Sequence, residues 1–502
     1  MATYHSLSFA PLQHLCVWSN RKNFCRLFRF AKRCVFVQCA KLPKLAYFRN
    51  VKEVVHQLHC CGNVDATQDS SKETVIQVLR KRGLIDQTTG PEVEKLCQKP
   101  VRIYVGFDPT AESLHVGNLL GIVILRWFQL YGHQPVVLLG GATGKIGDPS
   151  GKSMERPLLD NETIARNLQG IKRNFERILV FSHDTTNPVE PIFLNNDDWL
   201  GKMGFLEFLR DVGKYTRVGT MLGKESVRNR MNSEEGISFT EFSYQLLQAY
   251  DFVHLHKHYG VQLQAGGSDQ WGNIVAGKEL ARRLLGANLH GLTFPLLTSS
   301  DGRKFGKSEK GAIWLSPEKL SPFEFYQFLY KTSDADVIRL LKCLTFLPLS
   351  EIEELELRMN SSSFYKANTA QKLLAEEVTK LVHGEEGVKI AERVTSASSP
   401  GRLVEESILD FDTLRHLKGE IPSKEIRREH LLQRSLVEVL VECGIMKSKS
   451  EAKRFISNGG CYINNRRVQE LDRSISKEDL VENDMLLLGI GKKQKILLVA
   501  TE

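Results

Sequence analysis

Two short segments far apart in the chain carry residue types suited to handling a polyphosphate. The first, residues 115–118, reads HVGN, and the second, residues 304–308, reads KFGKS. Glycine lets backbone approach a ligand closely, and the first N–H groups of a helix that begins near Gly117 are free to bind phosphate. Two lysines beside a glycine on a loop suit an anionic leaving group such as pyrophosphate. Either segment alone also fits a solvated turn, but the pair predicts an ATP-dependent enzyme.

A helix expected over residues 244–251 (YQLLQAYD) carries three polar side chains with regular spacing. Tyr244, Gln248 and Asp251 stand at i, i+4 and i+7, which places them on one helix face. Such a face predicts one wall of a polar cleft, and the alternative is the exposed side of a surface helix. The stretch 147–153 (GDPSGKS) is not a P-loop, because Ile146 occupies the position where that motif requires glycine.

With the segments 140–144 (GGATG) and 266–273 (GGSDQWGN), these motifs resemble the tyrosyl-tRNA synthetases of bacterial and organellar type, which are class I aminoacyl-tRNA synthetases. The resemblance runs from about residue 70 to the C-terminus. It implies that the carboxylate of tyrosine attacks the α-phosphate of ATP, and that a tRNA for tyrosine, tRNA(Tyr), then accepts the tyrosyl group on its terminal ribose. ATP is a substrate in this chemistry, Mg²⁺ accompanies its phosphates, and neither a protein-held metal nor a prosthetic group is expected.

The resemblance also implies a role for individual residues. Tyr104 and Asp251 are expected to meet the phenolic hydroxyl of tyrosine, and Asp148, Tyr244 and Gln248 its ammonium group. The full tyrosine-binding set is Tyr104, Asp148, Tyr244, Gln248, Asp251 and Gln270. The expected ATP-binding residues are Gly106, Asp108, His115, Gly117, Asn118, Gly267, Asp269 and Lys307. The expected catalytic residues are Thr110, His115, Asn118, Lys152, Arg156, Lys304, Lys307 and Ser308.

Two positions depart from the family pattern. Asn118 stands where the family often has His; it retains a donor, so we expect function to persist. Lys145 stands where an apolar residue is usual, and the sequence offers no explanation beyond an extra surface cation.

Near the C-terminus, residues 448–467 combine a cationic helix, a glycine turn and a short strand. This combination forms a basic platform suited to a phosphate backbone and resembles an S4-type RNA-binding domain. A solvated charged face is the alternative from charge alone. The expected RNA-binding residues are Lys449, Lys453, Arg454, Arg466 and Arg467.

The elements that must position these residues alternate between strand and helix from residue 101 onward. Residues 101–105, 135–139, 192–194 and 294–297 are apolar strand candidates, and residues 119–131 have helical spacing. Alternation of this kind predicts an α/β fold, a Rossmann-like doubly wound parallel-sheet catalytic domain, with ligands at the carboxyl ends of the strands. An α-helical domain and a small α+β S4-type RNA-binding domain are expected to follow.

The expected domain boundaries follow from these shifts in pattern. An organelle transit peptide occupies residues 1–65, and a helical segment at 66–98 begins with a capping box of Ser70 and Glu73 and ends near Gly83. The catalytic domain spans 99–315, the helical anticodon-arm domain 316–395, a Ser- and Pro-containing linker 396–427, and the S4-like domain 428–502.

Charge is distributed unevenly along the chain. Residues 1–50 contain nine Lys or Arg and no acidic residue, so they account for the whole net charge of +9. An Arg-rich, acid-free N-terminus is typical of a mitochondrial or chloroplast transit peptide; a secretory signal or a basic tail is the alternative. Six of the ten cysteines lie in the first 61 residues and the others are scattered, which predicts neither disulfides nor zinc. No apolar run is long enough for a membrane span.

Two other functions remain open from sequence alone. A tryptophan-activating sister enzyme would share the ATP motifs, but it is not expected to carry the Tyr104 and Asp251 pair. A relative that only binds RNA and assists splicing or folding would not need the lysines of residues 304–308. The family resemblance further implies a homodimer.

Overall fold

The computed structural model describes residues 73–501 except 152–153, 155, 181–188, 309–310, 362–364, 399–408, 483 and 492–493. The predicted transit peptide lies outside these residues. The first described helix, α3 (Val75–Lys81), begins at Thr74, which shares a capping box with Gln77. Ser70 of the expected capping box lies outside the described residues, and the helix that it was expected to open is capped by Thr74, where the same Ser/Thr-x-x-Glu/Gln pattern recurs four residues later. Gly83, with a φ of +72°, follows the last turn as expected.

A six-stranded sheet forms the centre of the catalytic part, in the order β1-β6-β5-β2-β3-β4. Its strands are β1 (Gln87–Thr88), β2 (Arg102–Phe107), β3 (Gln134–Leu139), β4 (Ile192–Asn195), β5 (Leu263–Gly267) and β6 (His290–Phe294). All neighbours are parallel except β1, which pairs antiparallel with β6. This arrangement confirms the predicted parallel α/β sheet.

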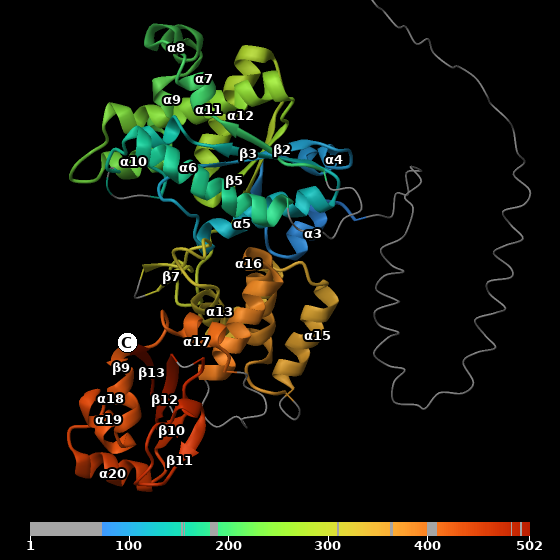
Figure 1. Ribbon diagram of the computed structural model, residues 1–502. Helices are drawn as coiled ribbons and strands as arrows, with labels where there is room; N and C mark the ends of the chain where they lie inside the picture. Colours follow the sequence, from blue (N-terminus) through green and yellow to red (C-terminus); the bar gives the residue numbers. More distant parts are fainter. Residues whose placement is uncertain are drawn as a thin grey trace, which may run out of the picture. The chain divides into compact units, whose positions relative to one another are not determined.

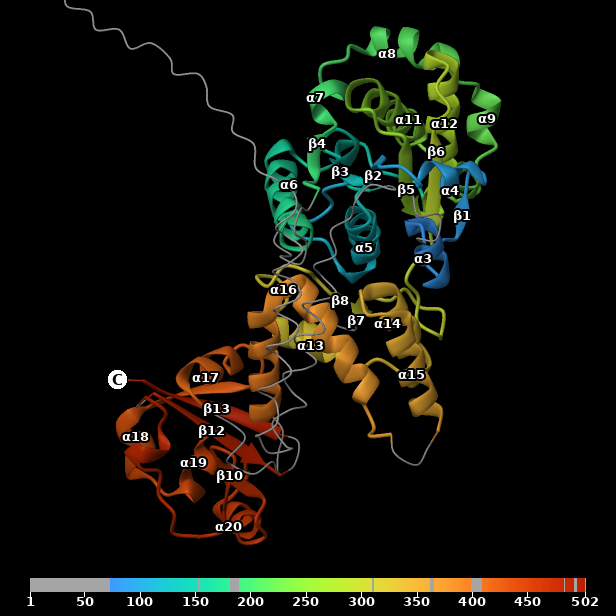
Figure 2. The same ribbon diagram turned by 90° about the vertical axis from the view of Figure 1, so that its right-hand side faces the viewer.

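Helices cover both faces of this sheet, because alternate residues of its strands are buried on opposite sides. Ile103 and Val105 of β2 pack with α5 (Val116–Leu130), whereas Tyr104 packs with α11 (Phe239–Tyr259). Figure 2 shows α5 and α11 on opposite sides of β2 and β3. The chain leaves β2 toward β3 on one side, and β5 pairs with β2 on the other. The carboxyl ends of β2 and β5 therefore flank the switch point where such folds bind ligands.

The other helices of this part are mostly short. They are α4 (Glu92–Leu96), α6 (Asn161–Phe175), α7 (Asp197–Leu200), α8 (Phe205–Asp211), α9 (Val218–Leu222), α10 (Glu225–Met231) and α12 (Trp271–Leu285). The short turns η1 (Thr143–Lys145) and η4 (Ser268–Gln270) follow β3 and β5 directly. Figure 1 shows this part in blue to yellow-green.

Helices dominate after residue 316, as the sequence pattern predicts. A small hairpin of β7 (Lys307–Ser308) and β8 (Gly311–Ala312) precedes α13 (Pro322–Tyr330), α14 (Asp334–Leu344), α15 (Leu349–Asn360) and α16 (Thr369–Ser398). α16 is interrupted at Gly384, whose φ is 72°. Each of the first helices has a Ser or Pro immediately before it, which suits a helix start.

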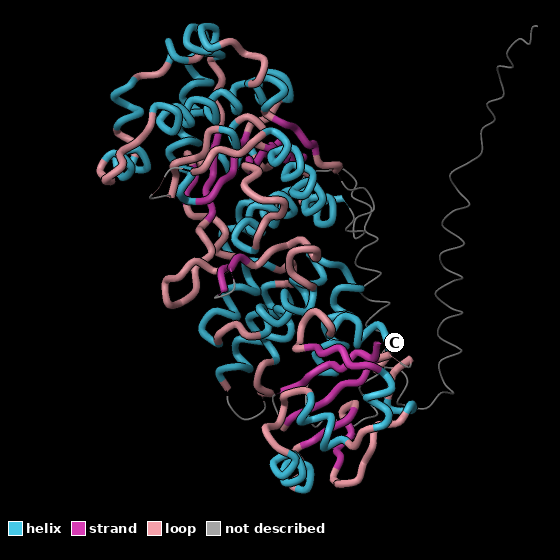
Figure 3. The backbone as a smooth tube through the Cα atoms, turned by 60° about the vertical axis from the view of Figure 1, so that its left-hand side comes forward, coloured by secondary structure: helices cyan, strands magenta, loops and turns pink. Residues whose placement is uncertain are grey.

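The C-terminal part contains a second sheet of five strands in the order β11-β10-β12-β13-β9. Its strands are β9 (Ser423–Arg427), β10 (Cys461–Ile463), β11 (Arg466–Val468), β12 (Met485–Ile490) and β13 (Gln494–Thr501). Three helices accompany it, α18 (Arg428–Gln433), α19 (Leu436–Glu442) and α20 (Lys449–Ser457). Figure 3 shows the strands of the two large sheets in magenta as separate groups.

Part of the expected linker at 396–427 is ordered structure. Residues 411–417 form α17 (Phe411–Leu417), and β9 pairs in parallel with β13. The polar composition of β9, SKEIR, hides it from a sequence search, since only Ile426 is buried. The residues that follow β9 form two helices, α18 and α19, because Ser435 caps the second one.

Candidate active site

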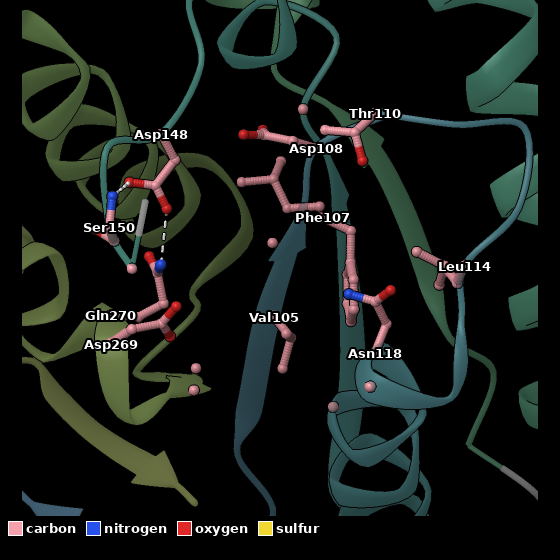
Figure 4. A pocket seen from close by; sticks show the side chains of 18 of the residues that line it. Val105, Phe107, Asp108, Thr110, Leu114, Asn118, Asp148, Ser150, Asp269 and Gln270 are labelled. Carbon is pink, nitrogen blue, oxygen red and sulfur yellow. Dashed lines mark hydrogen bonds between the residues drawn. The ribbon is translucent and has the colours of Figure 1, made fainter. Parts of the chain in front are cut away.

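A cavity of about 470 Å³ lies at the carboxyl ends of β2 and β5. It brings together sixteen of the residues predicted from sequence: Tyr104, Gly106, Asp108, Thr110, His115, Gly117, Asn118, Asp148, Arg156, Tyr244, Gln248, Asp251, Gly267, Asp269, Gln270 and Lys304. Lys152 lies outside the described residues. Lys307 and Ser308 form β7, and their side chains are likewise not described. Figure 4 shows Asp148, Gln270 and Asp269 on one wall and Asn118 at the start of α5 on another.

One end of the cavity is closed by Tyr104 of β2 and Asp251 of α11. Both side chains are only 1% exposed. The phenolic oxygen of Tyr104 is buried without a hydrogen-bond partner. Burial raises the pKa of the Asp251 carboxyl to about 7, and it raises the pKa of Tyr104 well above its ordinary value, with the nearby Asp251 adding to the effect. A buried hydroxyl without a partner and a buried acceptor suit a ligand that carries its own hydroxyl.

Two side chains that the sequence did not point to orient the Asp251 carboxylate. Asn196 Nδ2 donates to Oδ2 at 3.0 Å, and Trp199 Nε1 donates to Oδ1 at 2.9 Å. Both come from the segment that follows β4, at the carboxyl edge of the same sheet. Their position after a predicted strand is the signal that could have identified them.

A second carboxylate, Asp108, lies at the carboxyl end of β2. Tyr244 Oη donates to its Oδ2 at 2.9 Å, and Thr143 Oγ1 donates to its Oδ1 at 2.8 Å. The guanidinium of Arg156 approaches the same carboxylate, with its Nη1 3.9 Å from Oδ2. Burial raises the pKa of Asp108 to about 6, against the lowering effect of these partners. Asp108, expected to bind ATP, is thus joined to Tyr244, which is expected to bind the amino acid.

These two carboxylates belong to one hydrogen-bonded chain. Asn196 Nδ2 donates both to Thr143 Oγ1 at 2.9 Å and to Asp251. The chain therefore runs from Tyr244 through Asp108, Thr143 and Asn196 to Asp251. A connected network of this kind fixes the orientation of each member inside the cavity.

The third carboxylate, Asp148, is held by groups from two loops. Its Oδ2 accepts from Gln270 Nε2 at 2.7 Å, and its Oδ1 accepts from the backbone N–H of Ser150 at 3.0 Å. Figure 4 shows both bonds as dashed lines. The amine of Lys224 is buried nearby, and burial lowers its pKa to about 8 while Asp148 opposes that shift. Gln248 Oε1 is buried in the cavity without a hydrogen-bond partner, which leaves an acceptor for a ligand.

The two polyphosphate segments meet at the other end of the cavity. The backbone N–H of Val116 donates to Ile313 at 2.8 Å, so the start of α5 pairs with the chain just after β8. Gly306 has a φ of +98°, and a Cβ placed on it would lie 3.1 Å from the backbone nitrogen of Gly117. Asn118 Oδ1 accepts from the backbone N–H of His115 at 3.2 Å, which leaves its Nδ2 as a donor for a ligand.

Lys145, the other departure from the family pattern, pairs with Asp197 at 3.0 Å. Both side chains are nearly 40% exposed, so the pair stabilises the fold by only about 0.2–1 kcal/mol. The expected extra surface cation thus has a partner in the segment that also supplies Asn196 and Trp199.

The five predicted RNA-binding residues divide into two kinds. Lys453, Arg454 and Arg466 are exposed. Lys449 pairs with Glu438 at 2.8 Å, and Arg467 donates to the carbonyl oxygens of Gly459 and Asn458 at the end of α20. The guanidinium of Arg467 therefore has a structural partner as well as exposed surface.

Among the described residues no three His, Cys, Asp or Glu side chains are grouped as a metal site would require. In the same part of the chain, no helix is both long and apolar enough to span a membrane.

Comparison with known proteins identifies the class to which this cavity belongs. A family model described as tRNA synthetases class I (W and Y) matches residues 95–398, more than half of the chain. A second, described as Tyrosine--tRNA ligase SYY-like C-terminal domain, matches residues 413–498. The parallel sheet with its cavity at the switch point is the fold of that class.

The similar proteins narrow the class to one family. The Tyrosine--tRNA ligase of Protochlamydia amoebophila is 53% identical over 84% of this chain and 98% of its own length. The chloroplastic/mitochondrial Tyrosine--tRNA ligase of Arabidopsis thaliana is 50% identical over 85% of this chain and 83% of its own. A C-terminally truncated mitochondrial tyrosyl-tRNA synthetase of Aspergillus nidulans matches in structure with a TM-score of 0.58 and 34% identity, over 65% of this chain and 94% of that one. The chain belongs to the tyrosine–tRNA ligase family.

Proposed function

We propose that this chain activates tyrosine with ATP and then transfers the tyrosyl group to the 3′-terminal ribose of tRNA(Tyr). One observation carries the choice of tyrosine: the cavity ends in the buried, unpartnered hydroxyl of Tyr104 beside the oriented carboxylate of Asp251. A substrate hydroxyl satisfies both groups, whereas phenylalanine leaves them unpaired, at a cost of about 1–3 kcal/mol for each buried group. Family membership favours this function over the tryptophan-activating and RNA-assisting alternatives.

In the first step a carboxylate oxygen of tyrosine bonds to the α-phosphorus of ATP, and the bond from that phosphorus to the β-phosphate oxygen breaks. Asp148, Tyr244 and Gln248 hold the ammonium group, which points the carboxylate toward the start of α5. His115, Asn118 and Thr110 donate to the charge that develops on the α-phosphate. Lys304, with Arg156, Lys152, Lys307 and Ser308, neutralises the departing pyrophosphate. The acceleration arises from positioning and charge stabilisation, without a covalent enzyme intermediate.

The nucleotide is proposed to lie along three glycines at the cavity mouth, Gly106, Gly117 and Gly267, where the protein backbone can contact it closely. Asp108 and Asp269 are proposed to lie beside the nucleotide. Mg²⁺ bound to the ATP substrate would add positive charge to that of Lys304 and Arg156 at the phosphates. In the second step the ribose hydroxyl of the tRNA bonds to the activated carbonyl carbon, and AMP leaves.

Tyrosine-dependent exchange of pyrophosphate into ATP tests the first step. We expect exchange with tyrosine, little with phenylalanine and none with tryptophan. Exchange that depends on tryptophan, or the absence of exchange with any of the three, contradicts the proposal.

The C-terminal part is proposed to hold the tRNA through Lys453 and Arg454 of α20 and Arg466 of β11, all of which are exposed. The double change Lys453→Ala and Arg454→Ala should weaken tRNA charging and leave pyrophosphate exchange unchanged. Equal charging by the variant and the wild type at two salt concentrations would refute this role.

We also propose a homodimer. Between residues 205 and 239 large apolar side chains are strongly exposed, among them Phe205 at 65%, Leu206 at 78%, Val218 at 61% and Phe239 at 69%. Exposed apolar surface at this density is typical of an interface. Sedimentation velocity should show a dimer that Phe239→Glu weakens and that Leu357→Glu, an equally exposed position on α15, leaves intact.

The basic, acid-free N-terminus supports import into a mitochondrion, a chloroplast or both. A fusion of residues 1–70 to a fluorescent protein should enter an organelle. A matched fusion in which the nine Lys and Arg of residues 1–50 are replaced by Gln should stay outside.

A further inference from the structure

Outside the cavity, an aromatic ring stacks on the indole of Trp199. The ring of His254 stacks on it with a centroid distance of 4.2 Å and an angle of 12° between the planes. His254 lies on α11 one turn after Asp251, whereas Trp199 lies on α7. One helix therefore carries both the carboxylate that accepts from Trp199 and the ring that packs against Trp199.

The orientation of this indole matters, because its N–H donates to Asp251 Oδ1 at 2.9 Å. Rotation of the indole about its side-chain bonds would move that N–H away from the carboxylate. A parallel ring against one face restricts such rotation, since the contact is lost when the planes tilt. Asn196 fixes only the other oxygen of Asp251, so it does not replace this constraint.

Three further rings lie near His254. Its ring centroid lies 4.4 Å from that of His258 and 6.3 Å from those of Tyr250 and Tyr259. Burial, followed by the nearby His258 and Lys257, lowers the pKa of His254 to about 4. The ring is therefore neutral at physiological pH and adds no charge near Asp251.

We propose that His254 is a positioning residue for recognition of the substrate hydroxyl, acting through Trp199 on Asp251. His254 does not line the cavity, so it can act on the substrate only through other side chains. The inference rests on the proposed tyrosine-binding role of Asp251. The role proposed for His254 concerns only the hydroxyl end of the substrate. Loss of the stack between His254 and Trp199 weakens binding of tyrosine, but not of ATP or phenylalanine.

The test compares three single variants of the full chain in pyrophosphate exchange. His254→Ala should raise KM for tyrosine about 5- to 10-fold through partial loss of a hydrogen bond to a charged group. KM for ATP, kcat, and kcat/KM for phenylalanine should stay within about twofold of wild type, because none of them uses that hydrogen bond. His254→Phe keeps a planar ring and should restore KM for tyrosine, and the exposed Lys257→Ala on the same helix is the control.

A double-mutant cycle isolates the route through the indole. Trp199→Phe keeps an aromatic ring but removes the indole N–H, so adding His254→Ala to it should cost no further tyrosine affinity. Additive losses in the cycle, an unchanged KM in His254→Ala, or equal losses for tyrosine, phenylalanine and ATP would each overturn the inference. Failure of the wild type to exchange with tyrosine would instead overturn the proposed function, so the two failures are distinct.

Discussion

The two ends of the active-site cavity are built on opposite principles. At the hydroxyl end, Tyr104 and Asp251 are fully buried, and side-chain donors from another segment fix the carboxylate. At the nucleotide end, the start of α5 and the loop before β7 approach each other through glycines, and Lys304 of that loop is exposed.

The difference follows from what each end must distinguish. A phenolic hydroxyl is a single small group, and only buried polar groups that stay unpaired without it can reject a molecule that lacks it. A triphosphate is large and highly charged, so backbone N–H groups and mobile cations suffice to bind it. Substitutions at the hydroxyl end should therefore change substrate choice, whereas those at the nucleotide end should change rate.

The largest expected effect is at the hydroxyl end. Asp251→Ala removes the acceptor for the substrate hydroxyl and leaves the indole N–H of Trp199 and one N–H of Asn196 unpaired. We expect kcat/KM for tyrosine to fall on the order of 100-fold or more, since about 3 kcal/mol is lost. The value for phenylalanine should fall far less, so discrimination between the two narrows. Pyrophosphate exchange with both amino acids measures this.

The matched control is Asp198→Ala, an exposed carboxylate on the same segment as Trp199. It should leave both substrates unaffected. Unchanged tyrosine kinetics in Asp251→Ala would refute the assignment of the hydroxyl end and with it the comparison.

The side chains that line the two ends of the cavity were easier to predict from the sequence than the residues that hold those side chains in place. The helix face of Tyr244, Gln248 and Asp251 follows from spacing alone, since positions i, i+4 and i+7 must share a side. The strand 102–107 and the helix after it were likewise visible as apolar patterns. These features are local, so a single stretch of chain determines them.

The residues and strands that hold the cavity-lining side chains in place could not be predicted, because their structure depends on neighbours distant in sequence. β5 (LQAGG) has too few β-branched residues to be recognised, yet it is buried through its pairing with β2 and β6. Asn196 and Trp199 acquire their function only when β4 places them beside α11. β9 is a strand only because β13 supplies its hydrogen bonds. Each of these is a tertiary effect that overrides local propensity.

At the nucleotide end the sharpest test is Gly306→Ala. Its φ of +98° disfavours any side chain, and the new Cβ would press on the backbone of Gly117 at 3.1 Å. Strain of about 1–2 kcal/mol should displace the loop and lower kcat about 5- to 30-fold. KM for tyrosine should stay near the wild-type value, as measured by exchange at saturating ATP.

Gly302→Ala separates the effect of backbone strain at a positive φ from the effect of a close contact made by the new Cβ. Gly302 also has a positive φ, of +80°, but nothing lies within 4 Å of its Cβ position. It should therefore lower kcat less than Gly306→Ala. Equal effects of the two variants would mean that the contact with Gly117 contributes nothing.

The smallest expected effect is a pH dependence that only the hydroxyl end should show. Burial raises the pKa of Asp251 to about 7, so the carboxyl is ionised above that pH and accepts the substrate hydroxyl as a charged group. Below pH 7 it becomes protonated, and the hydrogen bond weakens by about 1 kcal/mol. The ratio of kcat/KM for tyrosine to that for phenylalanine should thus fall about three- to fourfold as pH drops from 8 to 6, since about a tenth of the carboxyl stays ionised at pH 6. Asp108, with a pKa of about 6, affects both amino acids through the shared ammonium end and cancels in the ratio. A ratio that stays constant while both rates fall would place the titrating group at the ammonium end and leave Asp251 ionised throughout.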